Sequence, residues 1–177
     1  MPRAQLRRLA ASLALTALIA LVTAGCAAGE PPRITVYSDG TSLRLAPLQY
    51  CDVTVSGCDA APDAKGSLTT RPGLPVQISV PESVSKTPWL VNVQSSNADG
   101  ETLPVRQEFF SPGETLAYPA RPGSPDERLL VVEIQQLGAA YAGKDDNTPI
   151  TDEFGNPQLV ARGVWSLELT PRDPAAS

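Results

Sequence analysis

The sequence contains no histidine, and its one methionine is Met1. Histidine is the commonest general base near neutral pH and the commonest metal ligand among side chains. Its absence excludes a Ser-His-Asp triad, a Cys-His dyad and histidine-based zinc or copper sites. Copper carriers that bind the metal through clusters of methionine or histidine are excluded for the same reason. An enzyme with this sequence would have to use paired carboxylates, or a serine with a lysine.

Basic residues are also few. The chain has 14 basic and 19 acidic residues, a net charge of −5, and three of the basic residues are Arg3, Arg7 and Arg8. Residues 1–25 hold no acidic residue, so the rest of the chain keeps 11 basic and 19 acidic residues and a charge of −8. Such an acidic chain has no positive surface for a phosphate backbone, and we expect no nucleic-acid partner.

The first 26 residues show the order of parts typical of an exported protein. The three arginines precede an uncharged apolar run over residues 9–22. At about 1.5 Å per residue this run is too short for the ~30 Å hydrocarbon core of a membrane, which favours a signal peptide over a spanning helix. The pair Arg7-Arg8 leaves twin-arginine export as an alternative route, although the residues that flank the pair fit that motif poorly.

The apolar run ends in Val22-Thr23-Ala24-Gly25-Cys26. This segment resembles the lipobox of bacterial lipoproteins, although Thr23 stands where that family usually has Leu, Val or Ile. The resemblance implies that residues 1–25 are a lipoprotein signal peptide and that Cys26 is the lipid attachment site. The alternative is an ordinary signal peptide followed by an unrelated cysteine.

These features predict the domain organisation of the chain. A lipidated tether, residues 26–32, would reach at most about 25 Å. It would hold a folded domain, residues 33–170, at the outer face of the cell membrane, and residues 171–177 would form a disordered tail. The predicted location is therefore extracytoplasmic and lipid-anchored.

Cys51 and Cys58 are the two cysteines that remain, with six residues between them. An even pair in an oxidising compartment is typical of a structural disulfide. A redox-active pair would usually have the two-residue CxxC spacing, and a metal site would need further ligands. We predict a Cys51–Cys58 disulfide, which stabilises by about 2.5 kcal/mol in the chain-entropy model.

The body of the chain alternates between apolar and polar residues with a period of two, which is typical of antiparallel sheets with one buried face. The clearest strands are expected at 74–80, 89–94, 130–135 and 165–170. Weaker ones are expected at 34–38, 43–45, 48–55, 103–109 and 114–118. With 18 prolines and 13 glycines marking turns between them, the pattern predicts an all-β, immunoglobulin-like antiparallel β-sandwich of about 7–9 strands after an N-terminal signal helix. We expect Trp89 and Trp165 in its core.

The longest stretch expected to be free of strands is 138–157, and loops of this length are often functional. Its oxygen-bearing side chains could bind calcium, although their spacing does not match an EF-hand loop. These residues are Asp145, Asp146, Asn147, Asp152 and Glu153. A small-molecule or calcium-binding envelope lipoprotein that uses this loop is therefore one alternative function.

A second alternative is an envelope hydrolase with paired carboxylates. The available side chains are Asp99, Glu101, Glu108 and Glu133. The segment Ser83-Val84-Ser85-Lys86 has the letters of an S-x-x-K motif, but it lies where a turn between strands is expected. We assign no catalytic residue, no metal ligand and no cofactor.

Several segments together resemble a family of uncharacterised secreted lipoproteins from actinobacteria, defined by a domain of unknown function. These segments are Tyr50-Cys51-Asp52 with Cys58, residues 75–81 and Pro88-Trp89, and the resemblance covers about residues 34–170. The resemblance implies a lipoprotein, and it supplies no activity and no site residues to carry over to this chain. The function expected from the sequence is that of a membrane-anchored, non-enzymatic lipoprotein with a protein-binding or accessory role in the cell envelope, whose envelope protein partner is not identified.

Overall fold

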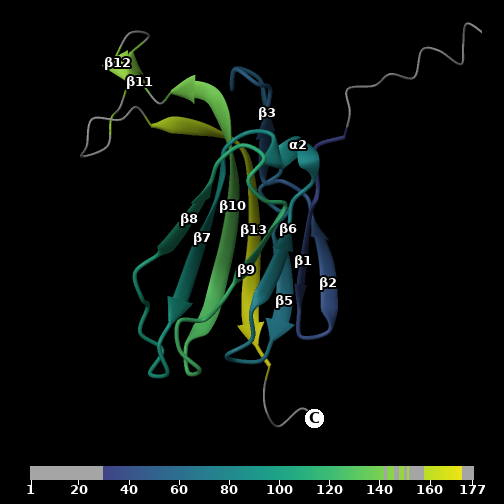
Figure 1. Ribbon diagram of the computed structural model, residues 1–177, viewed down its shortest axis with the longest axis vertical. Coiled ribbons are helices and arrows are strands. Elements are labelled where there is room, and N and C mark those ends of the chain that lie inside the picture. The colour runs from purple at the N-terminus through teal and green to yellow at the C-terminus, as the bar shows by residue number, and fades with distance from the viewer. Residues whose placement is uncertain (1–29, 142, 146–147, 150, 152–157, 173–177) are drawn as a thin grey trace, which may run out of the picture. The chain divides into compact units, whose positions relative to one another are not determined.

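The computed structural model describes residues 30–141, 143–145, 148–149, 151 and 158–172 (Figure 1). The chain divides into two compact units, Met1–Glu30 and Pro31–Ser177. Residues 1–25 and Cys26 lie outside the described residues. Within the described part, no helix has the length and apolar character needed to cross a membrane.

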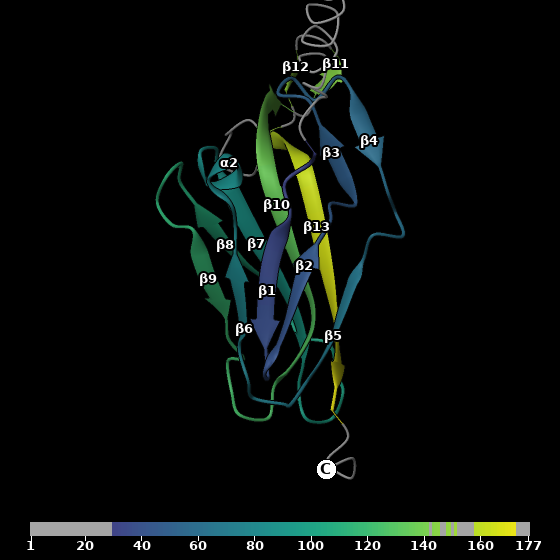
Figure 2. The ribbon, with the colours of Figure 1, turned by 90° about the vertical axis from the view of Figure 1, so that its right-hand side faces the viewer.

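Two main sheets form the body of the second unit (Figures 1 and 2). The small sheet has four strands in the order β2 (Thr41–Leu45), β1 (Ile34–Ser38), β6 (Val76–Ser79) and β9 (Ala117–Ala120). The large sheet has the order β4 (Cys58–Ala60), β3 (Gln49–Cys51), β13 (Leu159–Pro171), β10 (Arg128–Tyr141), β7 (Trp89–Ser96) and β8 (Arg106–Phe110), and β5 (Gly66–Thr70) also pairs with β13. The β5–β13 pair is parallel, and the other pairs of the two sheets are antiparallel.

Smaller elements connect these strands. A single helical turn, α2 (Glu82–Ser85), follows β6. Pro81 is its N-cap residue, and the Pro81 carbonyl oxygen accepts hydrogen bonds from the N–H groups of Val84 and Ser85 at 2.9 and 3.2 Å. Two short strands, β11 (Gly143–Asp145) and β12 (Thr148–Pro149), pair with each other.

The core lies between the two sheets and follows from the alternation of each strand. On β10, Val132 and Ile134 are fully buried, whereas Glu133 between them is only partly buried. Trp89 and Trp165 are both 0% exposed, so their predicted core positions are confirmed. The small sheet supplies β-branched side chains such as Val36 and Ile78 to the same cluster. An inner face of this kind is the main stabilising element of a sandwich.

Trp165 also holds the first residues of the folded domain in place. Its indole N–H donates to the carbonyl oxygen of Pro32 at 3.0 Å, and its ring lies 6.1 Å from that of Tyr50. The ring passes directly over Gly163, where a Cβ atom would lie 2.6 Å from Trp165 Cη2. Gly163 is therefore required by the close approach of an aromatic ring.

The all-β sandwich predicted from the sequence is confirmed, with more strands than the predicted 7–9. The two sheets contain four and seven strands because the short β3 and β4 are separate elements and because β5 adds to β13. The expectation that 138–157 is free of strands is wrong for its described residues. There β10 continues to Tyr141, and β11 and β12 follow.

The last strand of the large sheet continues past residue 170, the end of the folded domain expected from the sequence. Pro171 is the last residue of β13, and the N–H of Arg172 donates to the carbonyl oxygen of Thr70 at 2.9 Å. The parallel pairing with β5 holds this segment in place. Residues 173–177 lie outside the described part of the chain.

We predict that Gly163→Ala lowers the free energy of unfolding by about 1–3 kcal/mol, because the new methyl group overlaps the Trp165 ring in a packed core. Chemical denaturation measures the effect. In a Trp165→Phe background the outer ring atoms are missing. There the same glycine substitution should lower the free energy of unfolding by clearly less. Equal costs in the two backgrounds would contradict this contact.

Candidate functional site

The disulfide predicted from the sequence is present and joins Cys51 on β3 to Cys58 on β4. Within the loop it closes, the carboxylate of Asp52 accepts hydrogen bonds from the Thr54 and Ser56 hydroxyls and from the Ser56 and Gly57 amides, at 2.7–3.1 Å. The Ser56 hydrogen bonds, first among these contacts, hold the pKa of Asp52 far below its usual range. The acceptor positions of Asp52 are occupied by its own loop, so this loop is structural.

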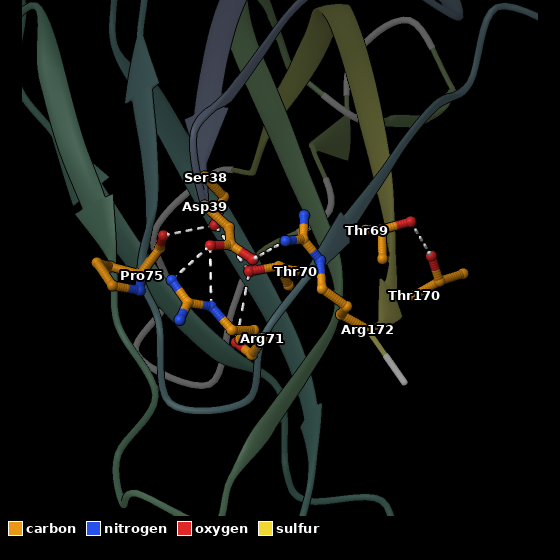
Figure 3. Close-up of polar contacts among 8 residues, drawn as sticks. All are labelled: Ser38, Asp39, Thr69, Thr70, Arg71, Pro75, Thr170 and Arg172. Carbon is orange, nitrogen blue, oxygen red and sulfur yellow. Dashed lines mark hydrogen bonds and ion pairs between the residues drawn. The ribbon is translucent and has the colours of Figure 1, made fainter. Parts of the chain in front are cut away.

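A second polar group surrounds Asp39, in the turn between β1 and β2 (Figure 3). Asp39 and Gly40 have φ angles of 47° and 81°, the left-handed values that an Asp-Gly type I′ hairpin turn requires. The Asp39 side chain is only 4% exposed. Its Oδ1 atom accepts hydrogen bonds from Arg71 Nε at 3.0 Å and Nη2 at 2.7 Å, and its Oδ2 atom lies 3.4 Å from Arg172 Nη1.

The Asp39 group connects the two sheets at the end where β1 stops. Arg71 directly follows β5 and Arg172 directly follows β13, so one carboxylate of the small sheet holds two ends of the large sheet. Beside it, the Ser38 hydroxyl lies 2.9 Å from that of Thr70 and donates to the Pro75 carbonyl oxygen. The hydrogen bonds from Arg71 keep the pKa of Asp39 below its ordinary value. These contacts indicate a clamp between the sheets, in which Oδ1 accepts the Arg71 hydrogen bonds and the buried Oδ2 has the ion pair with Arg172.

A second buried carboxylate, Glu127, is 6% exposed and lies just before β10. It accepts a hydrogen bond from the Gly123 amide and pairs with Arg106 Nη2 at 2.9 Å. Burial alone would raise the pKa of Glu127, but the Ser95 side chain, the Gly123 amide and the charge of Arg106 together hold it below its ordinary value. Arg106 Nη2 also donates to the Arg121 carbonyl oxygen at 2.8 Å, so this group fixes the loop before β10 to the edge strand β8.

The outer face of the large sheet differs from these three groups because it is open. An accessible groove of about 290 Å³ lies over β7 and β10. It is lined by Asn92, Gln94, Val105, Val131 and Glu133. The strand register explains the grouping, since Asn92 lies opposite Glu133 and Gln94 lies opposite Val131, and paired residues of antiparallel strands point to the same face.

Amide side chains order the polar wall of this groove. Gln107 Nε2 donates to Asn92 Oδ1 at 2.9 Å, and Asn92 Nδ2 in turn lies 3.4 Å from Glu133 Oε1. Gln135 Nε2 donates to the same carboxylate oxygen at 2.6 Å. Side chains held by one another in this way lose little freedom when a ligand binds. With two valines beside the amides, the groove can offer apolar contact together with hydrogen bonds.

Of the carboxylates named for the hydrolase alternative, Glu108 and Glu133 are not brought together by the fold. Glu108 lies opposite the buried Val91, whereas Glu133 lies on the outer face opposite Asn92, so the two carboxylates belong to opposite faces of the sheet. Asp99 and Glu101 lie in the turn after β7, where Glu101 accepts a hydrogen bond from Asn97 at 2.9 Å.

The Ser85 and Lys86 side chains of the S-x-x-K segment make their polar contacts within their own helical turn. Lys86 pairs with Glu82 at 3.1 Å, and the Ser85 hydroxyl donates to the Glu82 carbonyl oxygen. Among the residues that the structure describes, no group of three or more Cys, Asp or Glu side chains could hold a metal ion. The calcium candidates Asp146, Asn147, Asp152 and Glu153 lie outside those residues, and nothing of the Asp145 side chain is described.

The groove residues are visible in the sequence as the polar positions of alternating strands, but no signal there brings them together. Asn92, Gln94 and Glu133 occupy the wet positions of strands that the alternation predicts. Their grouping depends on which strands are neighbours and in what register, and alternation along one strand does not contain that information.

Comparison with known proteins places the chain among relatives without an assigned activity. Residues 27–170 match the model of a family described as protein of unknown function (DUF2771). The uncharacterized protein Mb0899c of Mycobacterium bovis is 30% identical over 142 residues, which are 79% of this chain and 78% of the relative. The uncharacterized protein Rv0875c of Mycobacterium tuberculosis matches with the same identity and coverage. No solved structure matches the chain.

We predict that Asp39→Asn lowers the thermal unfolding midpoint at neutral pH, where the wild-type carboxylate is charged and held by Arg71. The pKa of Asp39 is depressed in the folded state from an unperturbed 3.8, so its contribution is present above that pH and is lost on acidification through the folded pKa. The two proteins should therefore converge in stability as the pH falls toward 2.

Asparagine also tolerates the left-handed turn, so the substitution chiefly removes charge. Thermal melts across this pH range test the prediction, with Asp63→Asn at an exposed position as the matched control. A difference between wild type and Asp39→Asn that stays constant with pH would show that the turn, and not the charge, is responsible.

Proposed function

Since the chain belongs to the DUF2771 family of proteins of unknown function, we propose its function from its own sequence and geometry. It is a non-enzymatic binding protein, attached to the outer face of the cell membrane by lipid on Cys26. Its binding surface is the outer face of the large sheet, and its partner is another protein of the cell envelope.

The N-terminal segment supports the anchored location. A basic start, a short apolar run and a cysteine after small residues stand in the order that lipid attachment and export require. Five residues lie between Cys26 and Pro32, whose carbonyl oxygen accepts a hydrogen bond from Trp165, and the six residue steps span at most about 20 Å. A lipid on Cys26 would therefore keep the domain beside the membrane, and a stable anchor needs the second and third acyl chains that lipoproteins carry.

The groove on the outer face is the observation that carries the proposed binding role. Its amide and carboxylate side chains are ordered by hydrogen bonds among themselves, and they lie next to exposed apolar side chains. Val105 at the groove is 56% exposed and Phe109 on β8 is 53% exposed. Protein interfaces combine apolar contact with directed hydrogen bonds in this way. By contrast, the buried carboxylates Asp39 and Glu127 are already paired with arginines.

The composition supports a protein partner over other partners. The acidic balance of the chain disfavours nucleic acid and flat adsorption on an anionic bilayer. The absence of histidine removes the commonest general base near neutral pH and the hydrolytic mechanisms that depend on it.

We predict that Cys26→Ala releases the protein from the membrane, because the substitution removes the thiol that would carry the lipid. Cell fractionation and mass spectrometry of the N-terminal peptide measure the change, with the wild-type protein as reference. An unmodified wild-type N-terminus, or a Cys26→Ala protein that stays in the membrane fraction, would contradict the proposed anchor.

We further predict that a photo-reactive residue at Gln94 in the groove crosslinks the anchored protein to one envelope protein in living cells. The same residue at Tyr37, which is 50% exposed on β1 of the small sheet, serves as the matched control. Capture from both positions alike, or from neither, would count against the groove as the binding surface. Comparison with Cys26→Ala separates loss of the anchor from loss of the binding face.

A further inference from the structure

The two long sides of the sandwich differ in how their edge strands are covered. On one side β5 lies beside β2, and Gly66 approaches Leu43 and Leu45 so closely that a Cβ atom there would overlap both side chains (Figure 2). On the other side the edges are β8 and β9. Strand β9 contains Pro119, which has no N–H to donate to a further strand. Strand β8 contains no proline, and among the described strands it pairs with β7 alone.

An edge strand of this kind presents its outward N–H and C=O groups for pairing with another strand. The backbone before β8 follows β7 as well, since Leu103 N–H donates to the Ser95 carbonyl oxygen at 2.9 Å. The free edge therefore includes Val105 together with residues 106–110. Figure 1 shows β8 at one border of the large sheet.

The side chains along this edge are complementary to those of a second copy of the same strand that runs antiparallel to it. Arg106 and Glu108 flank Gln107 directly, and the exposed Val105 and Phe109 lie two residues away on either side. When two copies of this strand run antiparallel about Gln107, Arg106 lies opposite Glu108 of the second copy. Val105 then lies opposite Phe109 of the second copy. Opposite charges and apolar pairs directly across from each other both stabilise an antiparallel pair.

From this match we propose that the protein forms a two-fold dimer by antiparallel pairing of the β8 edges about Gln107. This inference does not depend on the lipid anchor or on the binding face proposed above. It concerns a second copy of the same chain, with the symmetric interface that dimers most often use.

The faces of the strand agree with this arrangement. Gln107 donates to Asn92 on the outer face, and Val105 lines the outer groove. Phe110 stacks on the core residue Trp89 with ring centroids 4.2 Å apart, so residues 106, 108 and 110 point to the inner side. A two-fold axis perpendicular to the sheet keeps outer positions outer and inner positions inner. Each proposed pair therefore joins two side chains of one face.

Other two-fold registers of the same strand are unfavourable. An axis through Arg106 would place two arginines opposite each other, and an axis through Glu108 would do the same with two glutamates. Only the axis through Gln107 places opposite charges across the seam. Arg106 is able to take a second carboxylate, since its contacts with Arg121 and Glu127 both use Nη2 and its side chain is 47% exposed.

The dimer would join two large sheets into one continuous sheet and bring the two grooves together across the seam. The pairing is short, so we expect a weak association, in the class of interfaces that bury little area. A crosslink placed on the symmetry axis is therefore the appropriate test.

Gln107→Cys places the two thiols on the axis, where directly opposed Cα atoms lie about 4.5–5.5 Å apart, within the range that a disulfide spans. We expect mild oxidation of the full-length protein in native membranes or mild detergent to give a dimer linked through residue 107. Mass spectrometry of the linked peptide identifies the bond. Ser42→Cys, exposed on β2, is the matched control and should remain monomeric.

A second variant tests the register. Glu108→Lys in the Gln107→Cys background places lysine opposite Arg106 on both sides of the seam, and crosslinking should slow about tenfold. Thermal melts confirm that each variant is folded. A folded, thiol-accessible Gln107→Cys protein that stays monomeric would overturn the proposal, as would equal crosslinking by Ser42→Cys or an unchanged rate with Glu108→Lys.

Discussion

Strand β10 pairs with β7 on one side and with β13 on the other, and the rest of the domain depends on the register of these two pairings. Side chains alternate with a period of two, so a slip of one residue would move Glu133 into the core and Val132 out of it. The register also decides that Trp89 and Trp165 meet the inner face of the small sheet. On the opposite face it creates the row Asn92–Glu133 that forms the groove. Core and groove are thus two results of one constraint.

The parts of the fold that the sequence predicts are those with strong alternation. Residues 89–94, 130–135 and 165–170 form the centre of the large sheet, as their pattern indicates. Strand β5 has only Leu68 as a large apolar residue, and it is held by parallel pairing with β13, a long-range contact that leaves no local pattern. Strand β4 is three exposed residues held by pairing with β3 and by the disulfide. The groove could not be predicted from the sequence for a similar reason. Alternation identifies its polar residues, but it does not show which strands are neighbours in the sheet.

At the margins of the sandwich, two buried carboxylates hold separate segments of the chain together, as apolar packing does at its centre. Asp39 and Glu127 each bind an arginine from a distant part of the chain, and each joins a loop to the end or edge of a sheet. A carboxylate out of water is costly unless it is paired, so these contacts also specify which loops meet which strands. The paired residues are 32 and 21 positions apart in the sequence, so no local motif predicts these two ion pairs.

The position of Pro32 has a mechanical consequence. Any pulling force applied through the residues before it meets first the Trp165 hydrogen bond and then β1, whose neighbours β2 and β6 both run antiparallel to it. A load directed along β1 acts on the hydrogen bonds of both ladders at once, in shear, and does not open them one after another. At the far end of β1, Asp39 passes the load through Arg172 to the last strand. The domain therefore resists traction from its N-terminus along a path that crosses from the first strand of the chain to the last.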